Sequence, residues 1–85
     1  MSAEITLYTR KECCLCDEMK KIVAQVISGT ETEVQEIDVD SSPELREEFG
    51  GEVPVLFING RKAFKYRVGA RELKERLENE LRRGR

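Results

Sequence analysis

A run of six residues, 53–58, is the feature that most constrains the fold. It reads Val-Pro-Val-Leu-Phe-Ile, and a continuous apolar run of this length is typical of a central strand that is buried on both faces. Pro54 must lie at the start of this strand, because proline cannot donate a hydrogen bond within a sheet. Asn59-Gly60 follows directly and is the strongest hairpin signal in the chain. These residues predict a buried central strand that turns back into a second strand over 61–66.

The first half of the chain has the pattern of a strand, a helix and another strand. Residues 5–9 alternate apolar and polar side chains and are rich in strand formers. From about Cys14 to Ser28, apolar residues recur at spacings of three and four, which predicts an amphipathic helix. Residues 33–39 predict the next strand. Because a helix joins these two strands, we expect them to be parallel with a right-handed crossover.

Two further helices complete the expected order of elements. A short helix is predicted over 43–49, where Ser41 or Ser42 can cap it and Ser41 with Glu44 fits a capping box. The last helix is predicted from about Ala70 to Arg82. The order is therefore strand, helix, strand, helix, strand, strand, helix, in one α/β domain that spans residues 1–85.

Composition limits the partners and the compartment. The 85 residues are enough for one domain and not two, and the net charge of -2 favours neither nucleic acid nor an acidic membrane as a partner. No apolar run approaches the roughly 20 residues that span a bilayer. The first residues lack the basic and apolar regions of a secretory signal, and the number of cysteines, three, is odd. We expect a cytoplasmic monomer, since these features suit a reducing compartment.

The chain contains no histidine. This excludes cysteine–histidine proteases, metal sites with histidine ligands and acid–base catalysis by imidazole. Any catalysis must use thiols, carboxylates, amines, phenols or backbone groups.

The thiols are concentrated at the predicted junction between the first strand and the first helix, where the chain reads Cys13-Cys14-Leu15-Cys16. Cys13 and Cys16 form a Cys-x-x-Cys pair, whose spacing at the start of a helix brings both sulfurs onto one face. Free N–H groups and the helix dipole favour the thiolate form of Cys13. A Cys-x-x-Cys pair near a βαβ pattern is a recognised redox signal.

This arrangement divides the chemistry between two thiols. Cys13 is predicted to attack a substrate disulfide as a thiolate and to form a mixed disulfide. Cys16, one turn inside the helix, is expected to be more covered and to have the higher pKa. It would then attack Cys13 and release the reduced substrate. Arg10 and Lys11 add positive charge near Cys13, whereas Glu12 opposes them.

Other interpretations of the cysteines remain open. They could be structural core residues, although three in four residues is unusual packing. A zinc site needs about four ligands, so we expect no metal in a single chain, but two chains could share a metal ion or an iron–sulfur cluster. Cys14 lies about 100° round the helix from Cys13. It could be inert but oxidation-prone, pair with Cys16, or act as a second exchange partner, and a strained bond to Cys13 ranks last.

Val53-Pro54 supplies a second motif. In this topology, a proline at the start of the third strand can be cis and face the cysteine turn, and we expect a cis bond here. The backbone of Val53 would then be exposed, and it could pair main chain to main chain with an extended thiol substrate. An ordinary trans proline that marks the strand edge is the alternative.

With both motifs in this order, the chain resembles the glutaredoxin/thioredoxin superfamily, and more narrowly the short bacterial and archaeal glutaredoxin-like proteins. Residues 7–17 resemble the first strand and active-site turn, and residues 52–60 resemble the cis-proline loop, third strand and hairpin. The resemblance implies a thioredoxin/glutaredoxin fold with a four-stranded mixed sheet of order 2-1-3-4, flanked by three helices. It implies that the first and last helices share one face, that Cys13 is the nucleophile and that Cys16 is the resolving thiol.

The resemblance also implies a substrate-binding set. Lys11 and Val53, followed by Pro54, match positions that hold glutathione in family members that use it. The turn before the last helix departs from the family, because Val68-Gly69-Ala70-Arg71 has arginine near the usual acidic place, although N–H groups at Val68 and Gly69 could still hold a carboxylate. We expect no bound cofactor. The expected substrates are disulfide-containing proteins or small thiol compounds, and glutathione or a thioredoxin reductase-like enzyme is the expected reductant.

Overall fold

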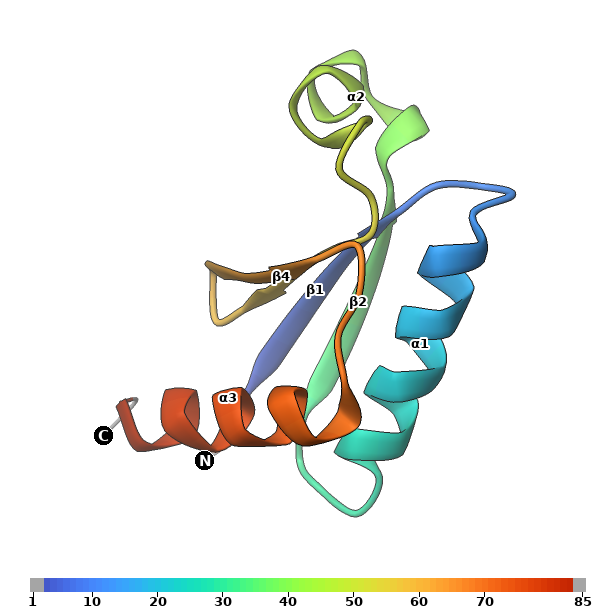
Figure 1. Ribbon diagram of the computed structural model, residues 1–85. Helices are drawn as coiled ribbons and strands as arrows, with labels where there is room; N and C mark the ends of the chain where they lie inside the picture. Colours follow the sequence, from blue (N-terminus) through green and yellow to red (C-terminus); the bar gives the residue numbers. More distant parts are fainter. Residues whose placement is uncertain (1–2, 84–85) are drawn as a thin grey trace.

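The structure, a computed structural model, describes residues 3–83 (Figure 1). A four-stranded sheet carries helices on both faces, as the sequence predicted. The elements in chain order are β1 (Glu4–Thr9), α1 (Cys14–Ile27), β2 (Glu33–Asp38), the short 3₁₀ helix η1 (Val39–Ser41), α2 (Pro43–Phe49), β3 (Val55–Ile58), β4 (Arg61–Lys65) and α3 (Ala70–Arg83).

The sheet has the order β2-β1-β3-β4. β1 and β2 are parallel, whereas β3 is antiparallel to both β1 and β4. The parallel pair is the one joined through α1, which agrees with the expected crossover unit. This mixed sheet confirms the predicted α/β fold and its strand order.

The two central strands bury side chains on both faces of the sheet. Leu7 of β1 pairs with Leu56 of β3, and both are at most 1% exposed. They belong to the larger core with α1 and α3, whose members are Ala3, Ile5, Leu7, Met19, Val23, Leu56, Ile58, Leu73 and Leu77. Because this one core contains residues of both α1 and α3, the first and last helices share one face of the sheet. Neighbouring residues on β3 point to the opposite face, because side chains alternate along a strand.

The opposite face of the sheet packs on α2 and η1. Val55 of β3, Val39 of η1 and Phe49 of α2 are buried there. The Phe49 ring stacks on Tyr8 of β1 with a centroid distance of 4.4 Å, and Phe57 meets both rings edge to face. Figure 1 shows α2 near the end of the sheet at which β1 leads into the loop before α1.

Asn59 and Gly60 form the predicted two-residue hairpin. Their φ angles are 51° and 83°, so both central residues have the positive φ that a type I′ turn requires. The Asn59 side-chain oxygen also accepts a hydrogen bond from the backbone of Glu4 at 3.0 Å. The turn is thus fastened to the start of β1.

β2 and β4 each end one residue earlier than expected, and two further differences lie at the start of α2 and of β3. Ser42 occupies the N-cap of α2 and its hydroxyl donates to Glu44, whereas the Ser41 hydroxyl donates to the carbonyl of Asp38. The Ser41–Glu44 capping box is therefore wrong, because the 3₁₀ turn η1 already uses Ser41. β3 begins at Val55 rather than at residue 53, since Pro54 has no N–H for the ladder.

Among residues 3–83, no helix is both long enough and apolar enough to cross a membrane.

Leu56 offers a test of the two-sided burial, because its side chain is fully buried at the centre of the sheet. We expect Leu56→Ala to lower the free energy of unfolding by about 2–5 kcal/mol, measured by urea unfolding of the reduced protein. Val34→Ala is the matched control, since Val34 is 40% exposed, and it should cost less than about 1 kcal/mol. Equal losses in the two variants would contradict this account of the core.

Candidate active site

The cysteine loop and the start of β3 lie at the same end of the sheet. Tyr8 pairs with Val55 in the antiparallel ladder between β1 and β3. One further step along both strands brings Thr9 opposite Pro54. The loop that leaves β1 toward α1 therefore starts beside the Val53–Pro54 turn (Figure 1).

Cys13 is the N-cap of α1. Its Sγ accepts a hydrogen bond from the backbone N–H of Cys16 at 3.2 Å, and its carbonyl accepts the first helical bond from Asp17 at 3.2 Å. The preceding residue, Glu12, has a φ of 58°, in the left-handed region that non-glycine residues rarely adopt. This turn places the Cys13 sulfur at a helix N-terminus, where free backbone N–H groups point outward.

Cys16 lies beneath Cys13 and is 1% exposed. Burial raises the pKa of its thiol from 9.0 to about 12, and a hydrogen bond to the Cys13 side chain adds to the rise. A hydrogen bond from the Arg10 backbone and the charge of Lys20 lower the pKa of Cys16, but burial outweighs them. Cys16 is therefore a protonated thiol at neutral pH.

The three thiols differ in access to solvent. Cys14 is exposed, Cys13 is half-buried and Cys16 is buried, and all three are free. A partner can therefore approach Cys13 and Cys14 from outside, whereas Cys16 is reached through Cys13.

The peptide bond between Val53 and Pro54 is cis. The Pro54 side chain is fully buried, and its carbonyl accepts a hydrogen bond from the Tyr66 backbone at 2.9 Å. Val53 is half-buried and packs against the core formed by Val39, Phe49 and Val55. The turn is thus held firmly beside the end of β1.

Comparison with known proteins agrees with this arrangement. Residues 4–78 match the family described as Glutaredoxin-like domain (DUF836). The chain belongs to this family. An uncharacterized protein of Mycobacterium tuberculosis is 30% identical over 76 residues, which cover 84% of this chain and 78% of the relative.

Solved structures give the same picture. A structural-genomics target protein from X. campestris is 30% identical and superposes with a TM-score of 0.75, over 88% of this chain and 96% of that chain. A mutant thioredoxin from Halobacterium salinarum is 24% identical, with a TM-score of 0.66 over 91% of this chain and 73% of that chain. The second likeness shows that the glutaredoxin-like domain has the thioredoxin fold.

A groove of about 300 Å³ begins beside the cysteine motif of this glutaredoxin-like domain. It runs between α1 and the connection from β4 to α3, and apolar side chains line it together with charged ones. The lining residues are Leu15, Glu18, Met19, Lys21, Ile22, Tyr66, Arg67 and Val68. Such a groove suits an extended segment with mixed apolar and polar groups.

The sequence did not single out two residues that shape this groove. Leu15 lies between Cys13 and Cys16 and lines the groove directly. Tyr66 has a φ of 68°, and its hydroxyl donates to the Gly51 carbonyl at 3.4 Å. The only feature of the sequence that could have indicated Tyr66 is that an aromatic residue follows the last strand directly.

The residues that the sequence predicted to bind substrate lie at separate places in the structure. Val68 lines the groove with Leu15, whereas the Gly69 carbonyl accepts the hydrogen bond from the Leu73 N–H at 3.0 Å at the start of α3. Lys11 does not line this groove. It borders another hollow, whose lining residues are Thr9, Arg10, Lys11, Lys20, Glu36 and Asp38.

Across the part of the chain that the structure describes, no three histidine, cysteine, aspartate or glutamate side chains gather in a way that could hold a metal ion.

The raised pKa of Cys16 gives a test by pH. The unfolded chain loses this proton near pH 9.0 and the folded chain near pH 12. Between these values the unfolded state binds fewer protons, so the stability that is fully present below pH 9.0 falls as the pH rises. We expect the reduced protein to lose about 1.4 kcal/mol per pH unit more than Cys16→Ala in this window. Urea unfolding at several pH values measures the difference, and parallel curves would contradict the assigned burial.

Proposed function

We propose that this domain is a dithiol oxidoreductase that reduces disulfides of proteins or mixed disulfides of small thiols such as glutathione. Cys13 is the nucleophile and Cys16 is the resolving thiol. One observation carries the proposal. The Cys13 sulfur caps α1 and accepts a hydrogen bond from the Cys16 N–H, and the protonated Cys16 thiol is buried directly beside it. Family membership supports thiol redox chemistry in general.

In the first step, the Cys13 thiolate attacks one sulfur of the substrate disulfide. A bond forms between Cys13 and that sulfur, the substrate S–S bond breaks, and the other substrate sulfur leaves as a thiolate. The N–H groups at the start of α1 stabilise the attacking thiolate. The exposed side of the N-cap gives the substrate its access.

In the second step, Cys16 loses its proton to solvent and attacks the Cys13 sulfur. The Cys13–Cys16 disulfide forms and the second substrate thiolate leaves, so that the substrate gains two electrons and the cysteine pair loses them. The high pKa of Cys16 keeps this thiol out of the first step. A thiol reductant such as glutathione, or a thioredoxin reductase-like enzyme, then restores the dithiol.

We propose that an extended substrate segment lies across the Val53–Pro54 turn and enters the groove between Leu15 and Val68. The main-chain groups of Val53 are not part of the β3 ladder, which begins two residues later. They remain candidates for strand-like pairing with the substrate. Lys11 and the N–H groups near Gly69 are proposed contacts for carboxylates of the bound thiol compound.

We propose that the domain works as a monomer in the cytoplasm. Both cysteines that the chemistry needs come from one chain, and a reducing compartment would keep the pair reduced between turnovers. A metal or iron–sulfur carrier that shares cysteines between two chains stays a prediction.

Substitution of each cysteine in turn tests the roles. We expect Cys13→Ser to lower the rate of disulfide reduction at least about 100-fold, since a hydroxyl cannot replace the thiolate. Cys16→Ser should accumulate the mixed disulfide at Cys13, visible by mass spectrometry as the mass of the attached substrate. The assay is reduction of a disulfide-bonded peptide with glutathione as the reductant.

Cys14→Ser is the matched control in the same assay. Cys14 is exposed, and the Cys13 sulfur bonds to the Cys16 N–H instead, so the Cys14→Ser variant should reduce the peptide at a rate within about twofold of the parent. If Cys13→Ser keeps full activity, or if Cys14→Ser loses it, the assignment of nucleophile and resolving thiol is wrong.

A further inference from the structure

Two cationic side chains, here called the groove cations, line the groove that begins beside the cysteine motif. Lys21 belongs to α1, and Arg67 belongs to the connection between β4 and α3. Both residues are exposed, and among residues 3–83 neither side chain forms an ion pair or a hydrogen bond. Glu18 supplies the one carboxylate of the lining, so the groove has an excess of positive charge in a chain whose net charge is -2. A group with negative charge therefore suits this groove.

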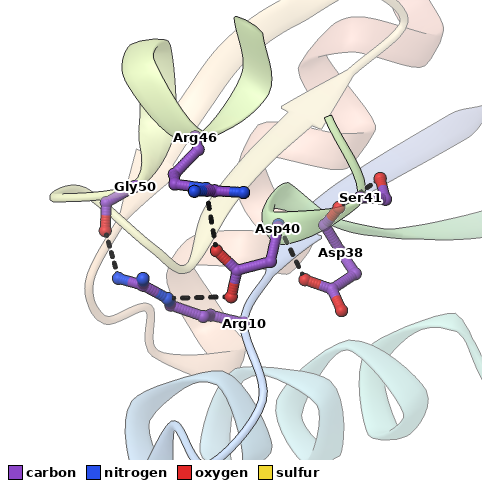
Figure 2. A network of polar contacts seen from close by, with 6 residues as sticks. All are labelled: Arg10, Asp38, Asp40, Ser41, Arg46 and Gly50. Carbon is purple, nitrogen blue, oxygen red and sulfur yellow. Dashed lines mark hydrogen bonds and ion pairs between the residues drawn. The ribbon is translucent and has the colours of Figure 1, made fainter. Parts of the chain in front are cut away.

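Other cations near the site are already bound within the domain. Arg10, on the loop before the cysteines, donates from Nε to Asp40 at 3.1 Å and from Nη1 to the carbonyl of Gly50 at 3.4 Å (Figure 2). Lys20 pairs with Glu36 at 2.7 Å. A carboxylate that approached Arg10 or Lys20 would have to compete with these partners, whereas the groove cations bind it without such competition.

Tyr66 is an exposed aromatic residue in the same groove. It is 41% exposed, yet its position is fixed by two hydrogen bonds. Its backbone N–H donates to the Pro54 carbonyl at 2.9 Å, and its hydroxyl donates to the Gly51 carbonyl at 3.4 Å. The ring is therefore held in place before a substrate arrives, which lowers the entropic cost of packing another side chain against it.

The remaining apolar lining decides between two sources of a carboxylate. Leu15, Ile22 and Val68 are half-buried and add apolar surface to the groove. Glutathione has carboxylates and an ammonium group but no apolar side chain, so it would leave this surface in water and bring a further cation to the groove cations. A protein segment can supply both an apolar side chain and a carboxylate, and it is therefore the better occupant.

We propose that the groove selects protein disulfides in which the reacting cysteine has an apolar residue and an acidic residue close to it in the chain. The apolar side chain packs on Leu15 and Tyr66, and the acidic side chain binds Lys21 and Arg67. This inference rests on the proposed function, because selection matters only where Cys13 attacks the bound disulfide. Lys21 and Arg67 are then residues that determine specificity and take no part in the transfer of electrons.

The test uses the whole chain with Cys14→Ser as the parent, so that the exposed thiol cannot react. The substrates are short peptides with a single cysteine, which a disulfide bond joins to thionitrobenzoate. The Cys13 thiolate attacks the peptide sulfur and bonds to it, and the coloured thionitrobenzoate leaves as a thiolate. Cys16 then loses its proton to solvent, forms the disulfide with Cys13 and releases the peptide thiol. The colour that is released gives the second-order rate constant.

Two peptides test the charge of the groove. The first has leucine and aspartate beside its cysteine, and the second has lysine in place of aspartate. We expect the aspartate peptide to react about fivefold to tenfold faster with the parent, because the groove cations attract aspartate and repel lysine. Lys21→Gln and Arg67→Gln should each lower this ratio about twofold to threefold. The double variant Lys21→Glu, Arg67→Glu should reverse it. Both peptides meet the same thiol, so a change in the reactivity of Cys13 cancels in the ratio.

Lys74→Gln is the matched control, because it removes the same charge from an exposed position of α3 that does not line the groove. Its ratio should equal that of the parent within the error of the measurement. Salt gives a second control, since about 0.5 M NaCl should lower the ratio of the parent by screening the exposed charges.

The apolar part of the groove has its own test. Tyr66→Asn removes the ring but keeps a residue type that tolerates a positive φ. The advantage of the leucine peptide over one with serine at that position should fall about threefold, because the leucine side chain loses a surface to pack on. The ratio between the aspartate and lysine peptides should stay as in the parent.

The outcomes separate the inference from the proposed function. Hydroxyethyl disulfide is small and neutral, so all these variants should reduce it at rates within about twofold of the parent. If the parent reduces it but the ratio of the two peptides is near one, the inference is overturned and the proposed function stands. The same holds if Lys74→Gln lowers the ratio as much as Lys21→Gln, or if the mixed disulfide of glutathione with thionitrobenzoate reacts as fast as the aspartate peptide. If the parent reacts with no substrate faster than its Cys13→Ser variant, the proposed function is wrong and the inference fails with it.

Discussion

The site depends on the burial of β1 and β3 as a central antiparallel pair. Leu7 and Leu56 pair at the centre of the sheet and fill the core beneath α1 and α3, while Tyr8 and Val55 face α2. Burial of apolar surface on both faces fixes the register, because a slip by one residue would exchange the two faces. That register brings the end of β1 beside Pro54, so the Cys-x-x-Cys motif and the cis-proline turn lie at the same end of the sheet.

The proposed chemistry depends on a difference between two thiols one helical turn apart. Cys13 caps α1 at the surface and receives a backbone N–H, whereas Cys16 points into the domain and is almost without exposure to solvent. Desolvation penalises charge on the buried sulfur, whereas the outer sulfur lies at a helix N-terminus, where free N–H groups point outward. One helix start thus presents an accessible thiol over a protected one, which is the order that the proposed disulfide exchange requires.

Much of this site could be predicted from local patterns. The periodicity of apolar residues located the helices, and Asn59-Gly60 located the hairpin, because both depend on neighbours in the chain. The capping of α2 could not be predicted as well, since Ser41 and Ser42 are adjacent and similar, and the 3₁₀ turn decided between them. The contact of Arg10 with Asp40 joins residues 30 positions apart, and no local pattern indicates it.

The sequence by itself determined the order of the elements, the Cys-x-x-Cys pair at a helix start and the proline before a buried strand. These features are local, and each depends on the spacing of a few residues. Only the tertiary structure decided how completely Cys16 is buried, that Leu15 and Tyr66 share a groove with Val68, and that Lys11 borders a different hollow. Burial and proximity between distant residues arise from the register of the sheet and the packing of helices on it, and the spacing of residues along the chain does not specify them.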